Sequence, residues 1–403
     1  MTGAWISIVG IGEDGLDGVP AAGRRLIDGA DVLVGGARHL AMIPQSHHAE
    51  RLTWRSPLKD TVADIEARRG RAVCVLATGD PMSYGIGVTL GRVFGAQALT
   101  VLPAPGAFTL AAARMGWPLE DVTRLTLHGR PLATLTSHVA PSARLLVLSE
   151  NGETPASVAR HLTDLGYGES GLTVLSHMGG TAEAVHTATA ETWGDTTTPD
   201  LNTIAVDCVA GKDATVLPLV PGLPDDAFDH DGQLTKREVR AATLAKLMSR
   251  RGALLWDVGA GCGSVAIEWM RAGGHAVAVE RDATRLEKLN RNAIALGVPQ
   301  LEIASGEAPH ALSVLKGTPD AIFIGGGISD PDIAAVCWDR LAPGGVLAAN
   351  AVTMEGEARL MALYQEWGGE LARLAISRLE PVGPYHGWRP LMPVTQYSVR
   401  KPR

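Results

Sequence analysis

The stretch Asp257-Val-Gly-Ala-Gly-Cys-Gly263 decides the fold of the second half of this chain. It follows an apolar segment, Ala253–Trp256, and precedes a segment with helical character, Ser264–Met270. A glycine-rich turn between a strand and a helix lets the backbone come close to a ligand. Nicotinamide-binding proteins favour the spacing G-x-G-x-x-G/A, but here Ser264 fills the third position and the glycines read G-x-G-x-G after an acidic residue. The stretch therefore predicts a ligand-binding turn and disfavours a nicotinamide-dependent oxidoreductase.

Apolar and amphipathic segments alternate around this turn, which predicts a parallel sheet covered by helices on both faces. The expected strands are 253–257, 276–280, 301–304, 320–324, 346–350, 371–378 and 394–400, and the expected helices are 264–272, 283–296, 307–315, 331–341 and 355–367. No helix separates the last two strands, so we expect them to pair antiparallel as a long hairpin. We also expect a capping box in which Thr235 and Glu238 satisfy amides at the start of a first helix.

The acidic residue Glu280 closes the second of these strands, and together with the glycine turn it resembles the class I S-adenosylmethionine-dependent methyltransferases. The resemblance implies a Rossmann-like fold with seven strands in a mostly parallel sheet, and S-adenosyl-L-methionine as the cofactor. It implies that Glu280 binds the two ribose hydroxyls. The other cofactor contacts that it implies are Asp257, Gly259, Gly261 and Gly263 at the methionine and ribose end, and Gly306, Glu307 and Ala308 at the adenine edge.

The first half of the chain also alternates, and three of its loops follow apolar strands: Gly10-Ile-Gly12, Thr78–Tyr84 and Pro103–Thr109. Ligands of open α/β sheets bind at the carboxyl ends of the strands. In this order the loops resemble the tetrapyrrole methylases, the class III S-adenosylmethionine enzymes, whose pattern is G-x-G-P-G, then G-D-P with a downstream Tyr, then P-G-x-S-S. The resemblance implies cofactor contacts at Gly10, Gly12, Gly79, Asp80, Ala107 and Thr109.

This chain departs from the tetrapyrrole methylase pattern in two of the loops. Glu13-Asp14 stands where the family has Pro-Gly, and Ala107-Phe-Thr109 replaces part of the Ser-Ser loop and keeps one hydroxyl, at Thr109. His128-Gly-Arg130 fits a signature of one subgroup of the family.

The sequence predicts a domain at 1–215, a proline-rich linker at 216–232 and a second domain at 233–403. A class III domain followed by a class I domain resembles the fused precorrin methyltransferases of cobalamin biosynthesis. That resemblance implies methylation of a precorrin at carbon 5 by the first domain. It implies methylation at carbon 15 and decarboxylation of the carbon-12 acetate by the second.

A precorrin carries many carboxylates, and arginine is suited to binding them in a bidentate manner. The candidate cations are Arg38, Arg51, Arg55 and Arg130 in the first domain, and Lys236, Arg237 and Arg240 in the second. We expect Lys236, Arg240 and His386 to be catalytic, His386 as a group that moves a proton. The sequence has no metal-binding motif, so no metal is expected.

The composition narrows the function classes. The chain of 403 residues has 46% hydrophobic, 20% charged and only 4% aromatic residues with a net charge of −7, which disfavours nucleic-acid binding. No apolar run reaches membrane-spanning length and no signal peptide is evident, so we expect a cytoplasmic protein without a membrane partner. Family relatives lead us to expect a homo-oligomer. A methyltransferase acting on RNA or a protein, and a non-catalytic tetrapyrrole carrier, remain as alternatives.

Overall fold

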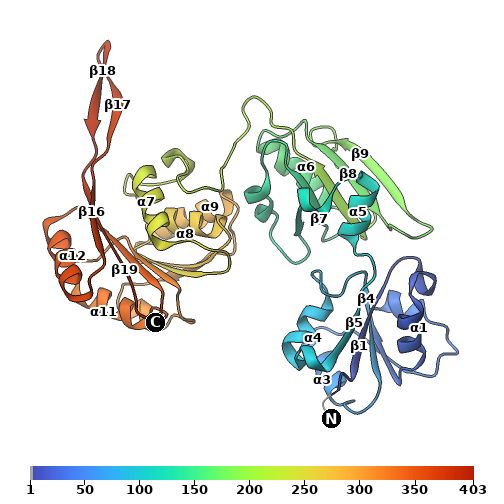
Figure 1. Ribbon diagram of the computed structural model, residues 1–403. Helices are drawn as coiled ribbons and strands as arrows, with labels where there is room; N and C mark the ends of the chain where they lie inside the picture. Colours follow the sequence, from blue (N-terminus) through green and yellow to red (C-terminus); the bar gives the residue numbers. More distant parts are fainter. Residues whose placement is uncertain (1–2) are drawn as a thin grey trace. The chain divides into compact units, whose positions relative to one another are not determined.

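The computed structural model describes residues 3–403 of the chain. They form two compact units: residues up to Leu132 with Val139–Thr215 belong to the first, and Ala133–His138 with Val216–Arg403 belong to the second (Figure 1). Each unit is described below by itself.

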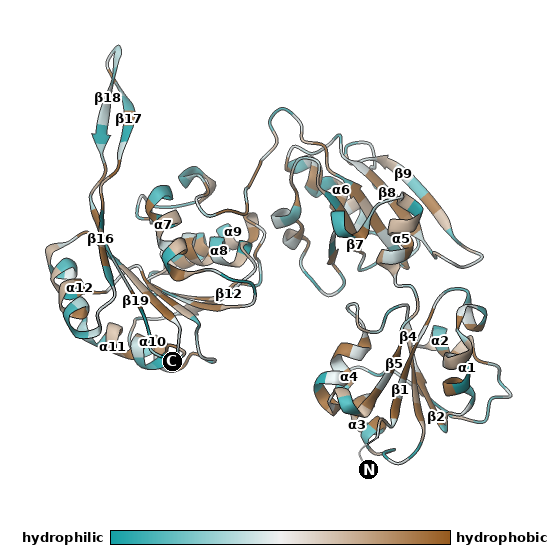
Figure 2. Cartoon of the chain, viewed as in Figure 1, coloured by the Kyte–Doolittle hydropathy of each residue, from teal (hydrophilic) through white to brown (hydrophobic). Residues whose placement is uncertain are grey.

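The first half of the first unit is built on a sheet of five parallel strands in the order β3-β2-β4-β1-β5. The strands are β1 (Ile6–Ile11), β2 (Val32–Gly35), β3 (Glu50–Thr53), β4 (Val73–Thr78) and β5 (Leu99–Leu102). The helices are α1 (Ala21–Asp28), α2 (Ala37–Ala41), α3 (Leu58–Glu66) and α4 (Ile86–Phe94). Alternate residues of β1 enter two separate cores, one against α1 and α2 and the other against α3 and α4. Hydrophobic residues therefore run along β1 and β4, as Figure 2 shows.

The second half of this unit holds a sheet in the order β6-β7-β10-β8-β9. The strands are β6 (Thr123–Thr126), β7 (Arg144–Leu148), β8 (Gly171–Ser176), β9 (Ala184–Thr189) and β10 (Asn202–Asp207). Only the β6–β7 pairing is parallel, and the other pairings are antiparallel. The helices are α5 (Ala107–Met115) and α6 (Thr154–Asp164), and α5 buries Phe108 and Ala111 against this sheet.

The second unit is built on a seven-stranded sheet in the order β13-β12-β11-β14-β15-β19-β16, parallel except for β19. The strands are β11 (Leu254–Val258), β12 (His275–Glu280), β13 (Glu302–Ser305), β14 (Ala321–Ile324), β15 (Val346–Ala351), β16 (Glu370–Leu374) and β19 (Val394–Arg400). Helices α7 (Arg237–Leu247), α8 (Ser264–Arg271) and α9 (Ala283–Ala295) share one core, while α10 (His310–Ser313), α11 (Pro331–Arg340) and α12 (Met354–Trp367) share the other. The predicted sheet and its antiparallel final strand are confirmed.

The segment 216–232, which the sequence predicts to be a linker, is instead packed into the second unit. Leu223 and Phe228 are buried in the core beside α7 and α8. The backbone N–H groups of Gly222 and Leu223 both donate to the carboxylate of Glu268 on α8, at 2.5 and 3.0 Å. The segment is therefore part of the second unit and not a free connection between domains.

The expected strand 371–378 ends early, at Leu374, because the chain leaves the sheet there. Residues Ser377–Val382 (β17) and Tyr385–Pro390 (β18) form a separate two-stranded antiparallel ribbon. Figure 1 shows this ribbon projecting away from the seven-stranded sheet. The expected final hairpin is therefore present, but with an extension that the sequence analysis did not predict.

The predicted capping box is wrong. Helix α7 begins at Arg237 with Lys236 as its N-cap, and no side chain of the capping position bonds to the helix amides. The N–H of Arg237 donates instead to Asp225 Oδ1 at 2.9 Å, and Glu238 pairs with Arg378 of β17. Asp225, from the 216–232 segment, thus satisfies a free N–H group at the start of α7 that a local cap residue satisfies in other helices.

Candidate active sites

The glycine turn of the second unit connects β11 to α8 in left-handed backbone conformations. Gly259, Gly261 and Gly263 have φ angles of 72°, 60° and 84°, which residues with a Cβ seldom adopt. A Cβ at Gly259 would also lie 2.8 Å from the backbone nitrogen of Gly326, in the loop after β14. The predicted tight turn is present and touches the neighbouring glycine loop, while its role in cofactor binding stays a prediction.

Asp257 is the buried acid at the start of this turn. Its side chain is only 1% exposed. Oδ2 accepts the N–H of Ala266 at 3.0 Å, whereas Oδ1 has no hydrogen-bond partner among the described residues. Burial, with a smaller contribution from the charge of Glu280, raises the pKa of Asp257 to about 7. The turn therefore presents an unused acceptor that would gain from a cationic or donor group of a ligand.

Glu280, at the end of β12, is turned toward the glycine turn. Its Oε2 accepts the N–H of Gly261 at 2.8 Å, and its Oε1 accepts the N–H groups of Arg281 and Asp282, both at 2.9 Å. A carboxylate has about four acceptor positions, so capacity for one further hydroxyl donor remains. Glu280 holds the glycine turn in place in addition to the ribose contact that the sequence analysis predicts.

The loop Gly306–Ala308 follows β13 and lies next to the end of β12. Gly306 N–H donates to the carbonyl of Glu280 at 3.0 Å, and Glu307 forms an ion pair with Arg281. The N–H of Gly325 similarly donates to the carbonyl of Val258, at 2.9 Å. The loops after β11, β12, β13 and β14 are thus joined at one edge of the sheet, where open α/β sheets bind ligands.

Arg240 is enclosed by protein groups, so its guanidinium has no open approach for a substrate carboxylate. Its side chain is fully buried. The guanidinium pairs with Glu268 and Asp225 and donates to the carbonyl oxygens of Thr235 and Leu223. Its helical spacing from Leu244 and Leu247 places Arg240 on the buried face of α7, a signal that the sequence analysis did not use.

The remaining candidates of the second unit lie at its surface. Lys236 is half-buried, and its Nζ donates to the carbonyl of Gly232 at 3.2 Å. Arg237 is exposed. His386 is exposed on β18, in the ribbon that stands away from the sheet, so the structure does not bring it together with Asp257 or Glu280 (Figure 1).

In the first unit the three predicted loops meet. A Cβ at Gly10 would lie 2.0 Å from the carbonyl oxygen of Gly79 and 2.4 Å from the nitrogen of Ala104. A Cβ at Gly79 would lie 2.8 Å from the Cα of Gly106. The loops after β1, β4 and β5 therefore pack backbone against backbone, and only glycine permits this approach.

Other predicted contacts of the first unit surround this meeting point. Asp80 follows Gly79 directly, and its Oδ1 accepts the N–H of Met82 at 2.9 Å. Gly12 is half-buried at the end of β1, and Ala107 and Thr109 lie in the first turn of α5, with Thr109 exposed. The structure brings these residues to one region, and their cofactor role remains a prediction.

Two of the candidate arginines have structural partners. Arg51 donates to the carbonyl oxygens of Leu40, Ile43 and Pro44 at 2.9, 3.1 and 2.6 Å, which fixes the loop after α2. Arg55 pairs with Asp64 of α3. Arg51 is therefore engaged in fixing the loop, whereas Arg55 pairs through Nη2 alone and keeps donors that face solvent.

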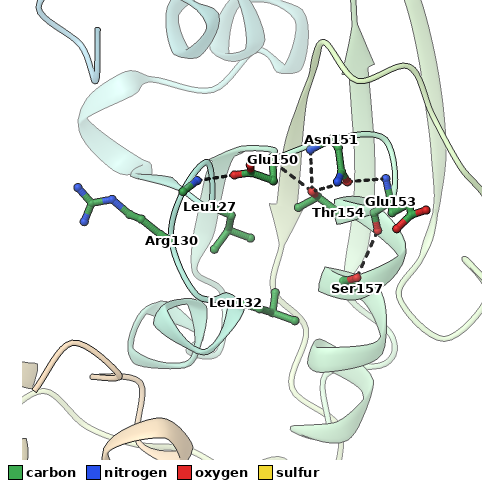
Figure 3. Close-up of a pocket in the computed structure, with 9 residues that line it drawn as sticks. Leu127, Arg130, Leu132, Glu150, Asn151, Glu153, Thr154 and Ser157 are labelled. Atoms are coloured by element: carbon green, nitrogen blue, oxygen red, sulfur yellow. Dashed lines mark hydrogen bonds between the residues drawn. The ribbon is translucent and has the colours of Figure 1, made fainter. Parts of the chain in front are cut away.

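Arg130 lies at the rim of a pocket of about 430 Å³ between the 127–132 loop and the start of α6. Figure 3 shows Leu127, Leu132, Thr154 and Ser157 around this pocket, with Arg130 extending away from them. The N–H of Gly129 donates to Glu150, which fixes the loop. The pocket lies at the carboxyl ends of β6 and β7, and Arg130 keeps a free approach to solvent there.

One cluster in the first unit was missed from the sequence. Glu13 pairs with Arg38 and accepts a hydrogen bond from His177 Nδ1 at 2.9 Å. Arg38 also approaches His39 Nε2 at 2.9 Å and Thr78 Oγ1 at 3.2 Å. The only sequence signal was the replacement of the family's Pro by Glu13, because His177 is 164 residues away in the chain.

Comparisons with known proteins agree with this arrangement. A family model described as Tetrapyrrole (Corrin/Porphyrin) Methylases matches residues 6–193, and one described as Precorrin methyltransferase domain matches residues 226–401. A precorrin-6Y C(5,15)-methyltransferase [decarboxylating] of Sinorhizobium sp is 45% identical over 98% of this chain and 96% of its own length. The chain belongs to the precorrin-6Y C(5,15)-methyltransferase family.

Two further relatives each cover less than half of the chain. A cobalt-precorrin-7 C(5)-methyltransferase of Salmonella typhimurium is 30% identical over 45% of this chain and 89% of its own length. A probable cobalt-precorrin-6B C(15)-methyltransferase (decarboxylating) of Sulfolobus acidocaldarius is 33% identical over 37% of this chain and 80% of its own length. Separate proteins thus carry the two activities that the names of the full-length relatives combine. Within residues 3–403, no helix has the length and apolar character needed to cross a membrane.

Proposed function

We propose that this enzyme transfers two methyl groups from S-adenosyl-L-methionine to a precorrin, at carbons 5 and 15, and removes the carboxylate of the carbon-12 acetate, in cobalamin biosynthesis. The observation that supports this best is that each unit has its own glycine-lined set of loops at the carboxyl ends of parallel strands. Two ligand sites in one chain suit an enzyme that modifies two carbons of one substrate.

In the second unit the residues present fit the cofactor. The unpaired Oδ1 of the buried Asp257 would accept a hydrogen bond from the cofactor's ammonium group. The left-handed turn at Gly259 and Gly261 has no side chains, so the cofactor could lie directly against its backbone. Glu280 retains an acceptor for a ribose hydroxyl, while the 306–308 loop would border the adenine. We assign the carbon-15 methylation and the decarboxylation to this unit.

In the first unit the meeting of Gly10, Gly79 and Gly106 leaves backbone groups, rather than side chains, facing a ligand. Asp80 and Thr109 provide polar side chains beside it. We assign the carbon-5 methylation to this unit, with support from the separate relative named as a C(5)-methyltransferase.

Bound S-adenosyl-L-methionine supplies an activated methyl group, so the protein has to position the nucleophile rather than create one. The loops of each unit would hold the methyl donor. The exposed Arg130 of the first unit, and the half-buried Lys236 and exposed Arg237 of the second, are suited to the substrate's carboxylates. No described side chain is assigned to the decarboxylation, for which the conjugated macrocycle can accept the electron pair.

The decisive experiment incubates the purified enzyme with precorrin-6Y and isotopically labelled S-adenosyl-L-methionine and analyses the product by mass spectrometry. We expect two labelled methyl groups gained and one carboxylate lost. A product with no label, or label recovered only in added RNA or protein, would refute the proposal.

The predicted self-association and cytoplasmic location belong to the same proposal. An isolated two-stranded ribbon is marginally stable in water, yet β17 and β18 expose the facing pair Leu379 and Trp388, at 55% and 73%. We propose that a second copy of the chain covers this ribbon. Nucleic-acid and membrane partners are not part of the proposal.

A further inference from the structure

The cluster around Glu13 joins the two halves of the first unit. Glu13 follows β1 and is 16% exposed, and its two oxygens contact Arg38 at the start of α2 and His177 after β8. Both strands end at these residues, so the cluster stands at the carboxyl ends of strands from both sheets. A Cβ on Gly180 would lie 2.7 Å from the Cβ of Glu13, which shows how closely the His177 loop packs on it.

Arg38 is also held in place by His39 and Thr78. Burial and the charge of Arg38 lower the pKa of His39 to about 4, so His39 is neutral and its Nε2 accepts from the Arg38 guanidinium. Arg38 also donates to Thr78 Oγ1. Because Thr78 directly precedes Gly79 and Asp80, this chain of contacts fixes Glu13 relative to the predicted cofactor loop.

His177 has the geometry of an oriented base. Its Nδ1 lies 2.9 Å from Glu13 Oε2, and a carboxylate accepts only from a protonated nitrogen. In its neutral form the ring is therefore held as the Nδ1–H tautomer, which leaves the lone pair of Nε2 available. The residue has a φ of 49°, and backbone in this region is concentrated at functional sites. Its side chain is 29% exposed.

The proposed carbon-5 methylation requires such a base. The bridge carbon bonds to the methyl carbon while the carbon–sulfur bond breaks, and the sulfur leaves with that electron pair as the neutral thioether of S-adenosylhomocysteine. The bridge carbon still carries its hydrogen at that stage. Loss of the proton returns the C–H electron pair to the macrocycle and restores its conjugation.

We propose that His177 Nε2 accepts this proton and that Glu13, fixed by Arg38, is the positioning residue that orients His177. The inference rests on the proposed function of the first unit and adds the catalytic group to it. An ion pair between Glu13 and Arg38 that served only to hold the loops together would not require His177.

The test uses the full chain with precorrin-6Y and S-adenosyl-L-methionine, and follows each methyl group by mass spectrometry in single turnovers. His177→Gln should slow the carbon-5 methylation by at least about 100-fold. The carbon-15 methylation and the decarboxylation should stay at the wild-type rate. His48→Gln is the matched control, because His48 is exposed and stacks on the ring of His47; it should leave both methylations unchanged.

Three readouts separate a base from a structural residue. Added imidazole should restore part of the carbon-5 rate in His177→Ala, with unchanged affinity for S-adenosylhomocysteine by calorimetry. Glu13→Gln should lower kcat for this step more than it alters KM. NMR of ring-labelled histidine should show His177 as the Nδ1–H tautomer in the wild type and a mixture of tautomers in Glu13→Gln.

The outcomes divide clearly. A carbon-5 rate for His177→Gln within about threefold of wild type would overturn the inference, since a base of this kind contributes at least 100-fold. A rate loss that imidazole does not restore and that parallels lost cofactor affinity would also overturn it, by making His177 structural. Failure of both methylations in the wild-type enzyme would instead refute the proposed function.

Discussion

Arg240 of α7 and Glu268 of α8 form an ion pair that is almost completely shielded from water, with exposed fractions of 0% and 3%. Glu268 also accepts the N–H groups of Gly222 and Leu223, and Arg240 donates to the Leu223 carbonyl. The pair thereby fastens the 216–232 segment to the second unit. Arg240, which the sequence analysis assigned to the substrate, therefore has buried structural contacts that hold this segment.

Replacing Arg240 with Met should destabilise the second unit by about 3–5 kcal/mol, because the Glu268 carboxylate is left buried without its partner. The free energy of unfolding of the second unit, measured in urea, gives the size of the effect. Lys246→Met is the control, since it breaks an exposed pair with Glu370 that should contribute less than about 1 kcal/mol. Equal losses in the two variants would contradict the structural role, as would an unchanged stability with a raised KM for the precorrin.

Asp257→Asn should change how the second unit's stability depends on pH. The folded-state pKa of Asp257 is raised to about 7, above the unfolded value of about 3.9, so the folded state binds the proton more tightly. The contribution of Asp257 to wild-type stability should therefore fall as the pH rises from about 4 to about 7, by an amount on the order of 4 kcal/mol relative to Asp257→Asn. Thermal melts across this range should show the fall in the wild type and its loss in Asp257→Asn.

Asp339→Asn serves as the comparison for this pH series, because Asp339 is an exposed carboxylate of the same unit. Its profile should match that of the wild type. A wild-type stability that rises between pH 4 and pH 7 in the second unit's transition, with Asp257→Asn unchanged, would show that Asp257 is not the group responsible.

Gly259→Ala should weaken cofactor binding at the second unit by about tenfold or more, because strain and steric conflict of this kind amount to about 1–3 kcal/mol. The added methyl group would sit at a φ of 72° and meet Gly326. Gly252→Ala is matched to it, with a φ of 76° but no atom within 4 Å of the new Cβ. Calorimetric titration with S-adenosylhomocysteine should show the loss only in Gly259→Ala; the same loss in both variants would mean that the Gly326 contact is irrelevant.

Trp388→Lys should reduce self-association, because it places a charge on the face of the ribbon that we propose a second copy covers. Light scattering after size-exclusion chromatography should give a lower mass at equal concentration. Met361→Lys, on α12, alters a side chain that is 51% exposed outside the ribbon and should leave the mass unchanged. If Trp388→Lys keeps the wild-type mass, the ribbon is not the contact surface.

The sequence was sufficient to predict the central strands and the glycine turns. Strands buried on both faces appear in the sequence as apolar runs. The turns need glycine because their backbone has positive φ angles, which depends on neighbouring residues only. In the first unit, β3, β6 and β9 coincide with no apolar run in the sequence, and each lies at an edge of its sheet. Edge strands are half-exposed and mixed in composition, so no apolar run marks them.

The side-chain partners could not be predicted in the same way. Helical spacing places Arg240 on the same face as Leu244 and Leu247, but its partners Asp225 and Glu268 are distant in the sequence and only the folded packing identifies them. His177 and Glu13 meet only because two sheets bring distant loops together. The predicted role of His386 depended on the ribbon folding back onto the sheet, whereas the chain leaves the sheet after Leu374.

The central claim is that the two units bind the methyl donor independently. Calorimetric titration of the enzyme with S-adenosylhomocysteine tests it most directly. We expect two equivalents bound per chain in the wild type and one in Asp257→Ala, with the carbon-5 methylation retained in that variant. A single equivalent in the wild type, or the loss of both sites in Asp257→Ala, would contradict the account.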